Sequence, residues 1–169
     1  MSFFCWLKKK FKKSGTPNVE NTPAQKMAES EVVANVSMIL HDEWVTLTGL
    51  IRINSSFDYW VDFITALAYV ESGYNPKLVF MEPAPLYYES IGLLQLSTVD
   101  FKNYKYPAID LKNGYENLKF GIFILNKLAM LHGKVIYDSG NYWSTLRPGK
   151  NKESHARFLA KLKQLQLTN

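Results

Sequence analysis

The sequence predicts a mainly α-helical domain, because apolar residues recur at helical spacing and capping residues mark the ends of the apolar segments. Between residues 111 and 129, apolar side chains repeat at alternating steps of four and three, which places them on one helical face. Gly133 follows as a natural C-terminal stop. An apolar share of 47% in 169 residues is enough to bury the core of one domain.

The first helix is expected to begin after Thr22, since a capping residue followed by Pro23 is a good helix start. Apolar residues then recur on one face as far as about His41. Residues 44–54 fit either a strand or a continued helix, because their apolar residues only partly alternate.

The later elements are assigned from the same features. Residues 77–88 contain two prolines and predict a loop over a cleft, and a short helix is expected over about 90–103. The clearest helix spans about 112–132, where Gly121 indicates close packing against another helix. A last amphipathic helix is expected over about 152–166.

The net charge of +5 comes entirely from five lysines between residues 8 and 13. The other fifteen basic side chains balance fifteen acidic ones, so the body of the protein lacks the basic face that nucleic-acid binding needs. We therefore expect no nucleic-acid partner. Residues 1–22 are predicted to be a basic amphipathic tail with a linker, and residues 23–169 to form the domain.

The tail has two possible interpretations. If residues 1–13 are helical, four apolar side chains lie opposite most of the lysines, which favours weak contact with an anionic membrane or an anionic cell wall. A solvated tail with incidental aromatic residues is the alternative. The charges follow the apolar residues, which is not the order of a secretory signal. The apolar residues are Phe3, Phe4, Leu7 and Phe11.

Cysteine and histidine usage predicts neither a disulfide nor a metal site. Cys5 is the only cysteine, so no internal disulfide can form. His41, His132 and His155 are scattered and lack the spacing of metal ligands. We expect no metal and no cofactor.

Glu71 is the most informative residue of the chain. Trp60, Ile64 and Leu67 follow one another at steps of four and three, and Glu71 continues the series just before Gly73 ends the helix. Burial on this apolar face would raise the pKa of the carboxyl, as a general acid near neutral pH requires. The alternative is a solvated glutamate at a helix end.

Two motifs around this residue resemble those of lytic transglycosylases and goose-type lysozymes. Residues 71–76 read Glu-Ser-Gly-Tyr-Asn-Pro, similar to the catalytic-glutamate element of that superfamily. Residues 92–95 read Gly-Leu-Leu-Gln and resemble its G-L-M-Q element, 21 residues after the glutamate. A segment with Asp110, Asn117 and Gly121 resembles a further element. The resemblance covers about residues 55–165 and implies a lysozyme-like helical domain with a cleft.

The resemblance implies roles for individual residues. Glu71 matches the catalytic acid, Gln95 the glutamine that shapes the sugar groove, and Leu94 the apolar residue beside the acid. Ser90 resembles, more loosely, a serine often found just before G-L-M-Q. These matches imply that Ser90, Leu94 and Gln95 bind substrate, which would be the glycan strands of peptidoglycan.

The family's third element, usually A-Y-N-x-G, is not present as such. Residues 140–144 read Gly-Asn-Tyr-Trp-Ser in a comparable place, and Tyr142 is the best candidate for its tyrosine. Core packing under the last helix is the alternative for Tyr142 and for Trp143.

The second carboxylate separates two chemistries. Goose-type lysozymes often place an aspartate two residues after the glutamine, where this chain has Ser97, although Glu82 or Glu89 is available in the preceding segment. With one well-placed acid, the resemblance favours a lytic transglycosylase, in which Glu71 acts as acid and then as base to give a 1,6-anhydro product. A hydrolytic muramidase, action on chitin-type glycans and a non-catalytic glycan-binding or structural role remain alternatives.

The expected site of action is the cell wall, yet residues 1–13 do not form a secretory signal. A bacteriophage lysis enzyme or a virion-associated lysin, delivered by other means, would fit both observations.

Overall fold

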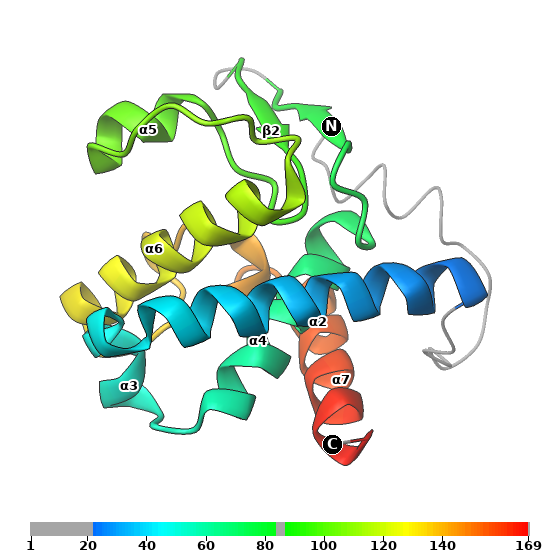
Figure 1. Ribbon diagram of the computed structural model, residues 1–169. Helices are drawn as coiled ribbons and strands as arrows, with labels where there is room; N and C mark the ends of the chain where they lie inside the picture. The colour runs from blue at the N-terminus through cyan, green and yellow to red at the C-terminus, as the bar shows by residue number, and fades with distance from the viewer. Residues whose placement is uncertain (1–21, 84–86, 169) are drawn as a thin grey trace.

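In the computed structural model, which describes residues 22–83 and 87–168, helices pack around α4 and a short hairpin lies at one end (Figure 1). Helices α2 and α7 contact α4, while α3 contacts α6. The elements are α2 (Pro23–Glu43), η1 (Trp44–Thr46), α3 (Thr48–Ile53), α4 (Phe57–Ser72), β1 (Val79–Met81), β2 (Glu89–Ile91), α5 (Val99–Tyr104), α6 (Gly114–His132), η2 (Ser144–Leu146) and α7 (Lys152–Thr168). The mainly α-helical fold class is confirmed.

Helix α2 begins as predicted. The Thr22 hydroxyl oxygen accepts a hydrogen bond from the Gln25 N–H (3.2 Å), and the Gln25 side chain accepts one from the Thr22 N–H (3.0 Å). This capping box pairs two backbone donors that a helix start otherwise leaves free. The apolar face of α2 is buried at Val32, Val36, Ile39 and Leu40.

The ambiguous segment 44–54 is helical, and a distant side chain provides the reason. The Asn126 Oδ1 atom on α6 accepts hydrogen bonds from the N–H groups of Gly49 (2.9 Å) and Leu50 (3.2 Å), which lie in the first turn of α3. A Cβ atom at Gly49 would lie 2.6 Å from the Asn126 carbonyl oxygen, so only glycine allows this approach. The cap comes from another part of the chain, and local periodicity therefore could not reveal it.

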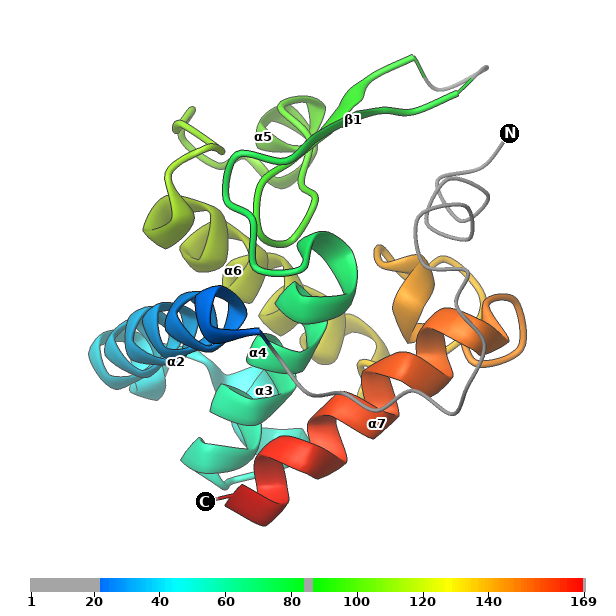
Figure 2. The same ribbon diagram turned by 90° about the vertical axis from the view of Figure 1, so that its right-hand side faces the viewer.

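Two predictions for residues 77–103 were wrong. The expected loop contains β1, which pairs with β2 as an antiparallel hairpin that projects from the helices (Figure 2). The expected helix over 90–103 begins only at Val99, because β2 and a turn at residues 92–95 occupy its first half. Strands of three residues are too short to show alternation in a sequence.

Helix α6 matches its prediction closely, from the Asn113 cap to the Gly133 stop (φ 64°). The prediction that Gly121 packs against another helix was wrong. A Cβ atom at this position would lie 2.2 Å from the Leu94 side chain, so Gly121 accommodates the turn at residues 92–95 and not another helix.

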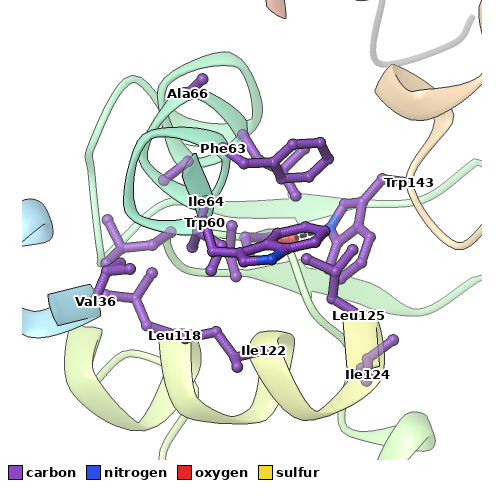
Figure 3. Packing of buried hydrophobic residues seen from close by; sticks show 14 of the residues in the cluster. Val36, Trp60, Phe63, Ile64, Ala66, Leu118, Ile122, Ile124, Leu125 and Trp143 are labelled. Carbon is purple, nitrogen blue, oxygen red and sulfur yellow. Dashed lines mark hydrogen bonds between the residues drawn. The ribbon is translucent and has the colours of Figure 1, made fainter. Parts of the chain in front are cut away.

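The hydrophobic core is built from buried residues of α2, α4, α6 and α7, and Figure 3 shows apolar side chains of α4 and α6 that face one another in it. The Phe63 ring of α4 packs edge-on against Phe158 of α7, with 4.9 Å between centroids. The predicted inward face of α7, which also includes Leu162 and Leu165, is confirmed. In the described ranges, no helix is both long enough and apolar enough to span a membrane. The predicted tail over residues 1–13 lies outside the described residues.

Candidate active site

Glu71 lies in the last turn of α4, on the face that this helix buries. The Ser56 hydroxyl oxygen caps the start of α4, and Gly73 ends it in the left-handed conformation (φ 62°), which glycine adopts without strain. The Glu71 side chain is 8% exposed, and its Oε1 atom has no hydrogen-bond partner among the described residues. The predicted burial of this carboxyl on the apolar face is confirmed.

The surroundings of Glu71 favour its protonated form. Burial raises its pKa to about 7, because the charged form loses its hydration. A hydrogen bond with the Thr145 side chain lowers the pKa, the negative charge of Glu82 raises it, and the positive charge of Arg157 lowers it. The carboxyl therefore keeps its proton up to about neutral pH and can act as a proton donor there.

Thr145 belongs to η2 and is buried against the start of α7. Its hydroxyl oxygen lies 3.5 Å from the Ser154 Oγ atom, and its carbonyl oxygen lies 2.9 Å from the His155 Nδ1 atom. Thr145 was not predicted from the sequence, because a single threonine in a loop forms no motif. The only signal near it was the incomplete third element at residues 140–144.

Residues 92–95 form a tight turn that Asn117 of α6 holds in place. The Asn117 Oδ1 atom accepts the Leu94 N–H (2.9 Å), and its Nδ2 atom donates to two backbone carbonyl oxygens, including that of Ile91 (2.9 Å). Gly92 has a φ of 79°, and a Cβ atom there would lie 2.4 Å from the Asn117 side chain. The turn therefore needs both the glycine and the buried asparagine.

Gln95 ends this turn with a φ of 50° and a side chain that is 8% exposed. Its Nε2 atom donates hydrogen bonds to the carbonyl oxygens of Gly92 (2.8 Å) and Leu78 (3.3 Å). These two bonds fix the orientation of the amide, and its buried Oε1 atom has no partner among residues 22–83 and 87–168. Gln95 thus presents an unpaired acceptor.

The structure places Leu94 and Ser90 in different surroundings. Leu94 is 1% exposed and packs against Gly121, so it supports the turn but offers almost no surface to a ligand. The Ser90 hydroxyl donates a hydrogen bond of 2.7 Å to the Glu82 Oε1 atom, across the hairpin.

Tyr142 is half-buried in the loop that precedes η2. Its hydroxyl donates to the Asp100 Oδ2 atom (2.6 Å), and burial and the charge of Asp100 raise its pKa. The next residue, Trp143, is 2% exposed and donates its indole N–H to the Leu94 carbonyl oxygen (2.9 Å). Core packing, the alternative for both rings, describes the buried Trp143, while Tyr142 packs against the core and stays partly exposed.

The two alternative carboxylates differ in their relation to Glu71. Glu82 follows β1, is half-buried, and its charge raises the pKa of Glu71. Glu89 is exposed in β2, opposite Met81 of β1. Glu82 is therefore the better placed of the two for a second acidic role.

The three histidines lie in separate places. The ring of His41 is 3.3 Å from the Asp42 carboxylate, that of His132 packs on Tyr137, and His155 lies beside η2. Across the part of the chain that the structure describes, no three His, Cys, Asp or Glu side chains are grouped to hold a metal ion. The absence of a metal and of a cofactor stays a prediction.

Comparisons with known proteins bear on the family and on the fold. A family model described as the transglycosylase SLT domain matches residues 49–147, more than half of the chain, and this range includes Glu71, Gln95, Tyr142 and Thr145. Two solved structures have a similar fold: Bd0314 DslA in its wild-type form 2, at 22% identity, and a glutamate-to-glutamine mutant of Bd0314 DslA, at 20%. Each has a TM-score of 0.62, with 80% of this chain and 90% of that chain covered. No curated protein matches the sequence.

Proposed function

Because the chain belongs to the transglycosylase SLT domain family, whose activity is peptidoglycan cleavage, we propose that it cuts the β-1,4 bond between N-acetylmuramic acid and N-acetylglucosamine with Glu71 as its acid. The observation that carries this proposal is the buried Glu71 carboxyl, whose pKa is raised to about 7 at the position of the family's glutamate motif. A general acid is most effective when its pKa lies near the working pH.

The proposed reaction needs one carboxyl group in two protonation states. Glu71 donates its proton to the glycosidic oxygen, and the bond between that oxygen and the muramoyl C1 atom breaks. The substrate's own N-acetyl group stabilises the positive charge that develops at C1. The Glu71 carboxylate then takes the proton of the muramoyl 6-hydroxyl, whose oxygen bonds to C1. The product is a 1,6-anhydro end, and Glu71 regains its proton.

Hydrolysis is the second candidate reaction, and Glu82 is the observation that favours it. Its charge acts on Glu71, and the Ser90 hydroxyl fixes one of its oxygens. A carboxylate so placed would activate a water molecule in a hydrolytic glycosidase. The Ser90 contact would then orient Glu82, although the resemblance implies that Ser90 binds substrate.

Product analysis separates the two reactions. Purified peptidoglycan is digested with the protein, and the released fragments are weighed by mass spectrometry. A transglycosylase gives anhydro ends, each lighter by one water molecule than the reducing ends that a muramidase gives. Reducing ends as the main product, together with their loss in Glu82→Gln, would support the hydrolytic reaction.

The proposed sugar groove includes Gln95 and Tyr142. The unpaired Gln95 Oε1 atom is suited to accept a hydrogen bond from an N–H or O–H group of the sugar, and such groups also occur in chitin-type glycans. Tyr142 is half-buried and keeps part of its surface exposed. Leu94, which precedes Gln95, packs against Gly121, and its carbonyl oxygen accepts the indole N–H of Trp143, the residue after Tyr142.

The pH dependence of the reaction follows from the protonation of Glu71. Because the acid must start protonated, kcat/KM is expected to fall above about pH 7. Thr145→Val removes the hydrogen bond that lowers the pKa of Glu71, so the fall in kcat/KM on the alkaline side of the pH profile (the alkaline limb) is expected to move to higher pH. Glu82→Gln removes the charge that raises this pKa, so its limb is expected to move to lower pH. A shift of the alkaline limb in the same direction in both variants would contradict these two effects on the pKa of Glu71.

For the tail we propose weak, salt-sensitive contact with anionic membranes or the cell wall through residues 1–13. Lysines near an anionic surface contribute about 1 kcal/mol each. Deletion of residues 1–20 is expected to reduce sedimentation with anionic vesicles at low salt and to leave turnover of soluble glycan fragments unchanged. Equal sedimentation of both proteins would show that the tail does not bind. Delivery to the wall as a bacteriophage lysis or virion-associated enzyme stays a prediction.

A further inference from the structure

Asp100 is a buried carboxyl group for which the proposed reaction has no use. It lies in the first turn of α5 and is 8% exposed. Its Oδ2 atom accepts the Tyr142 hydroxyl (2.6 Å) and the Ser97 N–H (3.3 Å). No described lysine, arginine or histidine forms an ion pair with it. The carboxyl is therefore bound by hydrogen-bond donors, and the tyrosine is the closest of them.

The hydrogen bond between Tyr142 and Asp100 joins two segments that are distant in the sequence. Tyr142 and Trp143 are consecutive, and both donate hydrogen bonds to the segment around Gln95: the phenol to Asp100 and the indole to the Leu94 carbonyl oxygen. The two rings pack edge-on, with 4.8 Å between centroids and 64° between planes. Their orientations are therefore coupled, and each is attached to the region after the turn at residues 92–95.

A hydrogen bond to a carboxylate is shorter and about twice as strong as one between neutral groups. Because the Tyr142 proton is directed to Asp100, the phenol oxygen can act only as an acceptor toward other groups, and the Ser97 backbone N–H already donates to it. The half-buried Tyr142 side chain is also held in one orientation. The Trp143 bond alone would not do this, since it holds the neighbouring residue and makes no contact with the phenol hydroxyl.

We propose that Asp100 is a positioning residue of the sugar groove: its carboxylate fixes the Tyr142 hydroxyl, and so orients the Tyr142 ring for the glycan strand. The inference rests on the proposed function, because it takes Tyr142 as part of the groove. Asp100 does not touch substrate. It acts through Tyr142, and its loss is therefore expected to weaken binding more than it slows the chemical step.

The test is a double-mutant cycle with Asp100→Ala and Tyr142→Phe, on soluble peptidoglycan fragments. Each single variant is expected to raise KM about tenfold and to change kcat by less than about threefold. The double variant is expected to raise KM no further than either single one, because both changes remove the same hydrogen bond. Asp100→Asn keeps the volume and one acceptor oxygen, so its KM is expected to lie between those of wild type and Asp100→Ala. Asp42→Asn, with an exposed side chain on α2, is the matched control.

Two further measurements test the folding of each variant and its binding of glycan separately. Melting temperatures show whether each variant folds, and Tyr142→Phe, which loses only one oxygen atom, serves if Asp100→Ala does not fold. Titration of N-acetylglucosamine oligomers into proteins that also carry Glu71→Gln measures binding without turnover. The inference would be overturned by an unchanged KM in Tyr142→Phe, by effects on KM that multiply in the double variant, or by a fall in kcat alone. In each of these cases, cleavage by the wild type would still uphold the proposed function. If the wild type neither cleaves nor binds glycan, the proposed function fails, and the inference fails with it.

Discussion

Replacing Glu71 with glutamine is expected to lower kcat by a factor of about 10²–10⁴, the usual contribution of general acid catalysis. Glutamine keeps the size of the side chain and a carbonyl oxygen, but it has no proton to give to the glycosidic oxygen. Because glutamine has nearly the same shape as glutamate, the packing around this buried position of α4 is expected to stay in place. The measurement is turnover of purified peptidoglycan, followed by turbidity and by fragment analysis.

The matched control is Glu31→Gln, an exposed glutamate on α2, which is expected to keep wild-type turnover. Activity of Glu71→Gln above a tenth of the wild type would remove Glu71 from the mechanism. The same result in a protein that still binds glycan would direct attention to Glu82, whose charge acts on the same site.

The same variant has a predicted effect on stability, and its sign follows from the pKa. In the unfolded chain the carboxyl titrates near its ordinary value of 4.5, whereas in the folded protein it titrates at about 7. As the pH rises through this window, the unfolded chain loses a proton that the folded protein keeps, so the free energy of unfolding falls, by at most about 3 kcal/mol. Glu71→Gln is therefore expected to match the wild type near pH 4 and to resist urea better at pH 8.

Replacing Lys161 with methionine is expected to lower the free energy of unfolding by about 3 kcal/mol, because it breaks a buried ion pair and leaves one partner behind. The Lys161 side chain of α7 has no exposed surface and forms an ion pair with the Glu29 carboxylate of α2, which is 21% exposed. The Glu29 Oε2 atom also accepts the Tyr74 hydroxyl (2.8 Å), and the ammonium lies 5.2 Å from the centre of the Tyr69 ring. The cluster thus ties α2 and α7 to the end of the helix that carries Glu71.

Thermal or urea unfolding tests this prediction, and the expected loss corresponds to roughly 10 °C in melting temperature. Lys163→Met is the control, because Lys163 is exposed two residues further along α7, and a change within about 0.5 kcal/mol is expected. Adding Glu29→Met to Lys161→Met is expected to restore much of the loss, since the carboxylate that has lost its ammonium partner is removed as well. A loss below about 1 kcal/mol in the single variant would show that the pair contributes little.

Helix positions were predicted well, because their signals are local. The Thr22 cap, the Gly73 and Gly133 stops and the apolar series of α4 each depend on residues within one segment. The series that ends at Glu71 predicted a carboxyl on a buried face, and this face is buried in the folded protein.

Predictions were wrong where residues from distant parts of the chain decide the structure. The hairpin of β1 and β2 was missed, and α5 was started too early, because Asn117 and not local periodicity holds the turn between β2 and α5. Lys161 shows a similar limit: it lies at helical spacing with Phe158 and Leu165, yet a lysine at such a position is usually exposed. Its burial depends on Glu29, which is more than a hundred residues away.

By itself, the sequence determined the helical fold class, the ends of most helices and the burial of Glu71, since each follows from spacing within a single segment. Only the tertiary structure decided which side chains lie next to the Glu71 carboxyl and which interactions hold the region around it. Thr145 reaches Glu71 from 74 residues further along the chain, and Asp100 holds Tyr142 across 42 residues. Neither pair has a sequence signature, because contacts between distant segments depend on how the helices pack, and packing is set by the whole core at once.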